Sequence, residues 1–295
     1  MAASPKYIHC MSTSFKAACI QNCATPDVAY NLEVTLGLTR EAATAGADLI
    51  CLPEYFSGVE TRDGLFLPAA FPENSHPALA AFRAAAQELR VWLHLGSLGI
   101  GSPGERVKNR SYVLTPNGEI AARYDKIHLF DVELSAGQVY LELGTVAPGD
   151  EAVVVALPWA DMGLSICYDL RFAALYRNLA QAGARVLAVP SAFTKLTGQA
   201  HWHVLIRARA IETGSYVIAP CQFGTLAGGG ECYGHSLIVD PWGQILADGG
   251  EDKGFVLAEI NLDQADAARA RIPALNHDRE FTPAVEDCQP SIAVR

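Results

Sequence analysis

The 295-residue sequence contains no apolar run of the roughly 18–20 residues that are needed to span a bilayer. The segment from Met1 to Phe15 lacks the apolar stretch of a secretory signal. The chain also has no cluster of lysine and arginine, and its formal net charge is −10. Proteins that bind nucleic acid normally present a basic face. These absences argue against a membrane protein, a secreted protein and a nucleic-acid partner.

The eight cysteines are irregularly spaced, and no pair has the spacing of a zinc ribbon. A chain of this length can bury its core without disulfide or metal staples. We therefore expect reduced thiols in a cytoplasmic protein. Metal ligation by His201 and His203 is disfavoured, because side chains two residues apart on a helix point to different faces. No metal and no organic cofactor is expected.

No linker rich in glycine, serine or proline divides the chain, and half of its residues are hydrophobic. We expect one domain over residues 14–285, an N-terminal lead at 1–13 and a C-terminal tail at 286–295. The last thirty or so residues are largely polar and contain three prolines. This composition predicts an extended segment at the end of the chain.

Apolar strand-like runs alternate with helical patterns along the sequence, which indicates an α/β fold. Strands are predicted at Phe15–Gln21, Ala47–Pro53, Val91–Gly96, Asn109–Leu114, Glu119–Tyr124, Ala152–Leu157, Gly163–Cys167, Val186–Pro190, Ser215–Cys221, Gly234–Val239, Gln244–Ala247 and Phe255–Ile260. Helices are predicted at Asp27–Ala45, His76–Leu89, Phe172–Ala182 and Gly198–Glu212. The pair Asn117-Gly118 predicts a hairpin turn, and Asp240-Pro-Trp-Gly243 predicts a type I turn.

Cys167 ends an apolar strand, and a helical pattern follows it. Side chains at such strand ends face a crevice in α/β proteins. The N-terminus of the following helix would stabilise a thiolate and a developing oxyanion. Cys167 is thus a candidate nucleophile, although a lone cysteine is more often a buried structural residue.

Two charged residues also end predicted strands, and each has a structural alternative. Glu54 follows a buried strand, so it is either a surface residue or a carboxylate that can act as a base. Lys126 ends the second strand of the hairpin, where it is either solvated or poised to stabilise an oxyanion. His128 is more typical of a packed histidine than of a partner for a catalytic cysteine. Nothing local distinguishes Glu142 from Glu133 as a further acidic site residue.

Together these motifs resemble the nitrilase, or carbon–nitrogen hydrolase, superfamily. The resemblance covers about residues 14–285 and includes the ordered motifs Leu-Pro-Glu54, Lys126-Ile-His-Leu-Phe and Ile-Cys167-Tyr-Asp-Leu-Arg-Phe. The sequence is most similar to the Nit branch of amidases, which includes deaminated-glutathione amidases and ω-amidases. Branch-level motifs include Thr197-Gly-Gln-Ala-His-Trp, Arg207-Ala-Arg-Ala-Ile-Glu and Tyr233-Gly-His-Ser.

The resemblance implies a four-layer α-β-β-α sandwich and assembly as a homodimer or larger homo-oligomer. It also implies that Cys167 is the nucleophile, Glu54 the general base and Lys126 the electrostatic catalyst. Glu142, rather than Glu133, aligns with the second glutamate of the family. The backbone N–H of Tyr168 is expected to join Lys126 in holding the oxyanion.

The expected substrate is a small amide that carries carboxylates, such as deaminated glutathione or 2-oxoglutaramate. Arg171 is a candidate to bind a carboxylate through its bidentate guanidinium, or else to form a structural ion pair. Thr194, Lys195 and Thr197 follow a strand end and are predicted to line the pocket.

Several other functions remain open. Nitrilases usually carry Trp-Glu after the nucleophile, whereas this chain has Tyr168-Asp169. A carbamoyl-amide hydrolase of the same superfamily is a further alternative, as is a non-catalytic protein with the same fold. A thiol redox protein would require Cys221 or Cys232 to reach Cys167.

Overall fold

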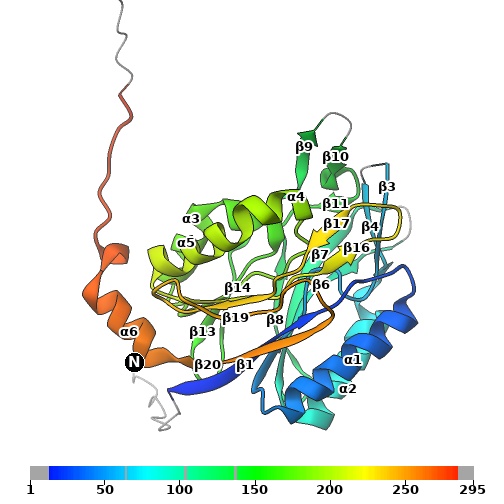
Figure 1. Cartoon of the computed structure of the whole chain (residues 1–295), viewed down its shortest axis with the longest axis horizontal. Helices are drawn as coiled ribbons and strands as arrows, with labels where there is room; N and C mark the ends of the chain where they lie inside the picture. The colour runs from blue at the N-terminus through cyan, green and yellow to red at the C-terminus, as the bar shows by residue number, and fades with distance from the viewer. Residues whose placement is uncertain (1–12, 64, 103–104, 136–137, 285–295) are drawn as a thin grey trace, which may run out of the picture.

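The computed structural model describes residues 13–63, 65–102, 105–135 and 138–284. The predicted lead and the predicted C-terminal tail fall almost entirely outside these ranges. Within them, two large sheets stack face to face, with α1 and α2 on one side and α3 and α5 on the other (Figure 1). This arrangement confirms the predicted α-β-β-α sandwich.

The first sheet has eight strands, in the order β11-β7-β6-β2-β1-β20, with β5 beside β6 and β8 beside β7. Its strands are β1 (Ser14–Gln21), β2 (Leu49–Cys51), β5 (Ala70–Phe71), β6 (Trp92–Ile100), β7 (Val107–Leu114), β8 (Ile120–Asp125), β11 (Val146–Ala147) and β20 (Gly254–Asn261). β1, β2 and β6 run parallel to one another, as helical crossovers between them require.

The second sheet has six strands, in the order β12-β13-β14-β15-β18-β19. Its strands are β12 (Val154–Ala156), β13 (Asp161–Leu164), β14 (Val186–Ala188), β15 (Tyr216–Ala219), β18 (Leu237–Val239) and β19 (Ile245–Asp248). The predicted type I turn connects the last two strands, and the Gly243 N–H donates to the Asp240 carbonyl at 2.9 Å.

The helices lie mainly on the outer faces of the sheets. The α-helices are α1 (Val28–Thr44), α2 (Pro77–Leu89), α3 (Ala173–Gln181), α4 (Lys195–Thr197), α5 (His203–Thr213) and α6 (Leu262–Arg271). A π-helical turn over Gly198–Trp202 joins α4 to α5, and 3₁₀ turns occupy Glu73–Ser75, Glu142–Gly144, Cys167–Arg171 and Ala274–Asn276. The helix predicted over Gly198–Glu212 therefore begins as a π turn.

Three short hairpins border one end of the sandwich and were absent from the predictions. They are β3 (Val59–Arg62) with β4 (Leu65–Pro68), β9 (Asp131–Ser135) with β10 (Gln138–Leu141), and β16 (Phe223–Thr225) with β17 (Glu231–Tyr233). Strands of three to five residues carry too few side chains to show a reliable alternation in sequence.

The alternation of side chains along β1 explains the layers. Ala17 and Cys19 belong to the core between the two sheets, whereas Ala18 and Ile20 belong to the core beneath α1 and α2. Successive side chains of a strand point to opposite faces, so one apolar run serves both cores. This is why the strand reads as continuously hydrophobic.

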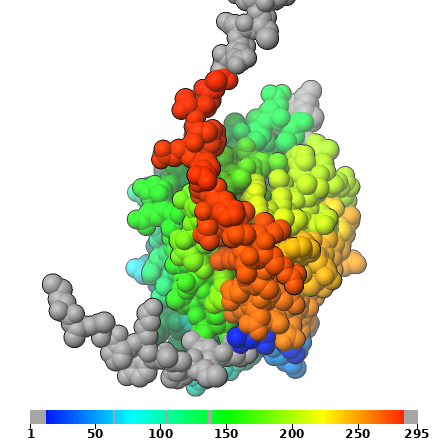
Figure 2. All heavy atoms as spheres, turned by 90° about the vertical axis from the view of Figure 1, so that its left-hand side faces the viewer, coloured from blue at the N-terminus to red at the C-terminus, as the bar shows by residue number. Residues whose placement is uncertain are grey.

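The prediction of an extended C-terminal segment is wrong for its first part. Residues Leu262–Arg271 form α6, which Asn261 caps by accepting from the Asp263 N–H at 3.0 Å. The helix buries only Leu262, Ala265 and Ala268, so its composition is polar even though its periodicity is helical. Figure 2 shows this orange segment lying along one face of the molecule, with the red residues after it running on from there.

None of the helices within the described ranges is long and apolar enough to cross a membrane.

Five buried thiols make the stability of the fold sensitive to alkaline pH. Burial raises the pKa values of Cys19, Cys51, Cys167, Cys221 and Cys232, that of Cys221 to about 12. These groups favour folding while the unfolded thiols, with a pKa of about 8.5, stay protonated, and this contribution is lost as the pH rises above that value. We expect urea unfolding under reducing conditions to show a loss of about 1.4 kcal/mol per buried thiol between pH 7.5 and 9.5.

The variant Cys51→Ala provides the control, because it removes one of these thiols. Its free energy of unfolding should be lower than that of the wild type, but it should fall less steeply between the two pH values. Equal slopes for both proteins would show that the buried thiols do not cause the alkaline destabilisation.

Candidate active site

A buried cluster of one lysine and two glutamates lies at the end of the sandwich. Lys126 Nζ lies 2.9 Å from Glu54 Oε1, and it lies 3.0 and 2.8 Å from the two carboxylate oxygens of Glu142. The side chains of all three residues are at most 4% exposed. The structure thus joins three residues that are far apart in the sequence. It places Glu142, and not the exposed Glu133 of β9, beside the lysine.

Each of these residues follows a strand of the first sheet or of its bordering hairpins. Glu54 lies three residues after β2, where the chain passes so close to β6 that a Cβ on Gly96 would lie 2.0 Å from the Leu52 carbonyl oxygen. Lys126 directly follows β8, and its N–H donates to the Asn109 carbonyl of β7 at 3.0 Å. Glu142 opens the 3₁₀ turn after β10.

The charges within the cluster depend on one another. Burial disfavours the ammonium form of Lys126, but the charges of Glu142 and Glu54 outweigh burial and hold the lysine pKa well above its ordinary value. Burial raises the pKa of Glu142, as does the charge of Glu54, while Lys126 opposes both effects. A charged lysine is therefore built permanently into the site.

Cys167 lies beside this cluster in a strained turn. It follows β13 by three residues, has a φ of 48°, and its N–H donates to the Pro190 carbonyl at 2.9 Å. Left-handed backbone is unfavourable for a residue with a Cβ and is often found at functional sites. The 3₁₀ turn Cys167–Arg171 and then α3 follow, so the thiol lies at a helix start as predicted.

The protonation of Cys167 depends on its burial and on the charged groups beside it. Burial raises the pKa of Cys167 well above its ordinary value, and so does Glu54 through its charge and a hydrogen bond, while Lys126 lowers it only in part. The resting form at neutral pH is therefore the thiol. Its conversion to a nucleophile requires a base, and Glu54 is the adjacent carboxylate.

Backbone and amide donors hold the two carboxylates in place. Asn109 Nδ2 donates to Glu54 Oε1 at 2.9 Å and to Glu142 Oε1 at 3.2 Å. The Ala192 N–H donates to the other oxygen of Glu54 at 2.9 Å, and the Phe130 N–H donates to Glu142 Oε2 at 2.7 Å. These donors satisfy the carboxylates without neutralising them, as buried charges require.

Asp169 connects the turn that contains Cys167 to β8 and to the residues after β8, which include Lys126. It is fully buried and accepts hydrogen bonds from Tyr124 Oη at 2.6 Å, from the Ile166 N–H at 2.8 Å and from the His128 N–H at 3.0 Å. The His128 ring contacts the same carboxylate at 2.7 Å and stacks on Phe172. His128 is therefore a packed and hydrogen-bonded residue, as predicted, and not a partner of the thiol.

A mainly apolar cavity is lined in part by the cluster. Its space is about 370 Å³, counting the part open to solvent. The lining residues are Glu54, Tyr55, Phe66, Lys126, Phe130, Glu142, Cys167, Tyr168, Ala192, Phe193, Thr194 and Thr197. A concave apolar pocket with a few converging polar groups is the usual form of a small-molecule site.

The structure separates the three pocket residues that were predicted after β14. Thr194 and Thr197 line the cavity, and their hydroxyls lie 2.7 Å apart. Lys195 is not among the lining residues, because its Nζ lies 3.5 Å from Glu251 and 3.8 Å from Glu231. Residues three apart on a helical turn share a face, and the two residues between them, here Lys195 and Leu196, point elsewhere. The expectation that Lys195 lines the pocket is therefore not met.

Arg171 lies behind two walls of the cavity. Its guanidinium carbon is 5.9 Å from the Tyr168 ring centroid and 5.5 Å from that of Phe193, and its nitrogens lie 3.4 Å from His201 Nδ1. Within the described residues it forms no salt bridge with a carboxylate, so the structural ion pair considered for it is not seen there. Its charge remains close to the cavity without a counter-ion.

Sequence reasoning missed several residues of the site. Asn109 was seen only as the first residue of a strand, and no spacing signal connects it with Glu54. Tyr55 has a φ of 52° and lines the cavity as a buried residue, but nothing in its sequence context pointed to the site. Phe66 and Phe130 lie at the hairpins that the sequence did not predict.

Comparison with known proteins identifies the family of this chain. The family model of carbon–nitrogen hydrolases matches residues 16–270. The chain belongs to the carbon–nitrogen hydrolase family. A deaminated glutathione amidase from Synechocystis is 41% identical over 89% of this chain and 97% of its own, and the human one is 39% identical over 89% and 81%. Human omega-amidase NIT2 is 33% identical over 94% of this chain and its entire own length.

Solved structures show the same relation. The NitFhit protein of C. elegans superposes with a TM-score of 0.82 at 32% identity, over 91% of this chain and 66% of that chain. Nit3 of Saccharomyces cerevisiae gives 0.79 at 27% identity, over 92% and 98%. The chain is therefore a hydrolase of carbon–nitrogen bonds, and it is an amidase of the nitrilase superfamily, as the sequence motifs predicted.

Proposed function

We propose that this protein hydrolyses a small amide bearing carboxylates to an acid and ammonia, through a thioester on Cys167. The observation that carries the proposal is the buried cluster, in which Lys126 contacts both Glu54 and Glu142 beside a protonated thiol. A nucleophile, a base and a fixed cation together are what acyl transfer requires.

In the first half of the reaction, Glu54 takes the proton of the Cys167 thiol as sulfur attacks the amide carbonyl carbon. The carbonyl oxygen becomes an oxyanion, which Lys126 and the Tyr168 N–H stabilise. Collapse of this intermediate breaks the carbon–nitrogen bond. Glu54 returns its proton to the departing nitrogen, so ammonia leaves and a thioester remains.

In the second half, Glu54 takes a proton from a water molecule, whose oxygen attacks the thioester. The same donors hold the second oxyanion, and its collapse releases the acid and the sulfur, which regains the proton from Glu54. Glu142 keeps Lys126 charged and positioned through both halves, because it contacts the ammonium with two oxygens. No step requires a metal or an organic cofactor.

The charge around the cavity supports a carboxylate on the substrate. Arg171 lies against Tyr168 and Phe193, two residues of the cavity wall, and forms no carboxylate ion pair within the described ranges. Relatives at 33–41% identity carry the names deaminated glutathione amidase and omega-amidase. We therefore assign Arg171, which does not itself line the cavity but lies against its Tyr168 and Phe193 walls, to the substrate carboxylate. Thr194 and Thr197, which line the cavity, are assigned as hydroxyl donors.

A substrate panel tests this assignment by the ammonia released. We expect kcat/KM for deaminated glutathione or 2-oxoglutaramate to exceed that for an uncharged amide of similar size by at least tenfold. Arg171→Ala should raise KM for the charged amides about tenfold or more, because it removes a charge-assisted hydrogen bond worth about 1.5–3 kcal/mol.

Arg177→Ala is the matched control, because Arg177 lies on α3 and pairs with Asp278 at the surface. It should leave every KM unchanged. A preference for uncharged amides, together with no effect of Arg171→Ala, would contradict the carboxylate assignment. Hydrolysis of nitriles but not amides would instead favour a nitrilase.

We also propose that the protein is a cytoplasmic homo-oligomer. Val204 and Ile211, seven residues apart on α5, are 66% and 54% exposed, and Gly243, which packs against Ile211, follows Trp242, which is 58% exposed. Apolar side chains gathered in this way are typical of an interface. The cysteines within the described ranges are free, which suits a reducing compartment. Light scattering on the purified protein would disprove the assembly if it gave a mass near 31.6 kDa.

A further inference from the structure

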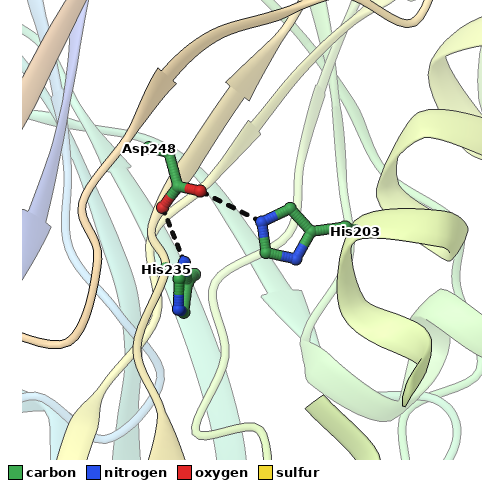
Figure 3. A group of neighbouring side chains, drawn as sticks. All are labelled: His203, His235 and Asp248. Carbon is green, nitrogen blue, oxygen red and sulfur yellow. Dashed lines mark hydrogen bonds and ion pairs between the residues drawn. The ribbon is translucent and has the colours of Figure 1, made fainter. Parts of the chain in front are cut away.

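A second cluster of ligand-type side chains lies outside the catalytic cavity. His203 comes from the first turn of α5, His235 from the turn between β17 and β18, and Asp248 from the end of β19 (Figure 3). Asp248 lies between the two rings, with Oδ1 2.8 Å from His235 Nδ1 and Oδ2 3.1 Å from His203 Nε2. One nitrogen from each ring and one carboxylate oxygen all lie within 4.8 Å of one another.

We propose that His203, His235 and Asp248 form a binding site for a divalent transition-metal ion. Two imidazoles and one carboxylate are donors suited to zinc, cobalt or nickel. At metal–ligand distances of about 2.0–2.2 Å, neighbouring ligand atoms of a tetrahedral site lie roughly 3.4 Å apart. The three donor atoms, which lie within 4.8 Å of one another, must approach by at most about 1.4 Å to reach this spacing. Their exposures of 29%, 22% and 34% leave room for water on the remaining positions.

The surroundings hold two of the three donors, Asp248 and His235, in place before any ion binds. The Gly250 N–H donates to Asp248 Oδ1 at 3.0 Å, and Trp202 Nε1 donates to the His235 carbonyl at 2.8 Å. The Tyr233 ring stacks on His235, with ring centroids 4.4 Å apart. Hydrogen-bonded and packed ligands of this kind are typical of the shell around a metal site.

A structural alternative exists, in which Asp248 simply accepts a hydrogen bond from each imidazole. The experiment below separates these two cases.

A few direct contacts connect this cluster to residues that line the catalytic cavity. His203 directly follows the π turn Gly198–Trp202, and Gly198 packs so closely that a Cβ there would lie 2.3 Å from the Tyr233 ring. Tyr233 in turn donates its N–H to the Phe193 carbonyl at 2.8 Å. An ion that binds α5, β19 and the turn before β18 would therefore restrict the movement of the segment that contains Thr194 and Thr197. The ion has no part in the proposed chemistry of Cys167.

Cobalt(II) titration of the full-length protein tests the proposal. Cobalt bound to nitrogen and oxygen shows visible d–d absorption, whereas thiolate ligation adds a sulfur-to-metal charge-transfer band in the near ultraviolet. We expect one equivalent to bind without that band and to be displaced by zinc. Asp248→Asn and His203→Gln should each weaken binding at least tenfold, while amide hydrolysis without metal stays at the wild-type rate.

His277→Gln is the matched control, because His277 is an exposed histidine outside the cluster, and it should bind cobalt like the wild type. Wild-type crystals soaked in cobalt provide a measurement that does not depend on variants, through the position of the anomalous peak. A peak elsewhere, no saturable binding, a thiolate band, or undiminished binding by Asp248→Asn would each overturn the proposal. Because the readout is bound cobalt, it does not depend on whether the proposed amide substrate is correct.

Discussion

Replacing Cys167 with alanine is expected to reduce amide hydrolysis to the uncatalysed background while the protein stays folded. The reaction proposed above has no other nucleophile, because the groups around the thiol are a base, a cation and a second carboxylate. The change removes one sulfur atom and leaves the ion pairs of Lys126 with Glu54 and Glu142 intact. Ammonia release across the substrate panel, together with the thermal unfolding midpoint, checks both parts of the expectation.

Mass spectrometry adds a readout that belongs to the mechanism itself. Wild-type protein quenched during turnover should carry the mass of the acyl group on Cys167, and the alanine variant should carry none. Cys221→Ala is the matched control, since Cys221 is also a buried free thiol, and it should keep the adduct and the activity. Full activity of Cys167→Ala on any amide of the panel would contradict the assignment of the nucleophile.

The sequence predicted the layers of the fold because the regular spacing of apolar residues is a strong signal in long helices and strands. β1 was predicted as Phe15–Gln21 and found as Ser14–Gln21, and α2 was predicted as His76–Leu89 and found as Pro77–Leu89. The short hairpins and α6 were not predicted. Their burial depends on which distant segments they contact, and this information is not local to their residues.

In the site, too, some residues could be recognised from their neighbours in the sequence, and others only from contacts with distant segments. Glu54, Lys126 and Cys167 could be selected because each follows a strand, and because their order resembles a known family. Asn109 could not be selected, since its role arises only when β7 lies beside both glutamates. Lys195 was grouped with Thr194 and Thr197, because the sequence did not show that these residues form a helical turn. In that turn the Lys195 side chain points away from the cavity that the two threonines line.

The protonation of Cys167 could not be derived from its position in the sequence. A cysteine at a helix start suggested a thiolate, since the helix dipole favours negative charge there. Burial and the adjacent Glu54 charge raise the pKa of Cys167 and outweigh that effect. Burial is the larger of the two effects. A helix terminus contributes about 0.3–2 kcal/mol, whereas burial can shift a pKa by up to about 3–5 units, at about 1.4 kcal/mol for each unit.

Replacing Lys126 with methionine is expected to abolish turnover and also to destabilise the fold. Loss of one oxyanion donor typically lowers the rate by about 10²–10³. In addition, Glu54 and Glu142 are left facing each other without a counter-ion, and breaking a buried pair in this way costs about 3–5 kcal/mol. Ammonia release and the free energy of unfolding in urea at pH 8 measure the two losses.

The pH dependence of this loss identifies its cause. Without the ammonium, the main group that opposes the effects of burial and of the Glu54 charge on Glu142 is lost, so the pKa of Glu142 in the folded variant should lie further above the unfolded value of about 4.3. The penalty is then absent below that value and grows as the pH rises, so the variant should be closer to the wild type at pH 5 than at pH 8. A destabilisation that did not change with pH would point to packing instead.

A double variant separates stability from catalysis. Adding Glu142→Gln to Lys126→Met removes one of the two unpaired charges, so part of the lost stability at pH 8 should return. Activity should not return, because neither residue then stabilises an oxyanion. Positions in contact are expected to show such coupling, and distant positions are not. If the second substitution lowered stability further, Glu142 would be held mainly by the Phe130 and Asn109 donors rather than by Lys126.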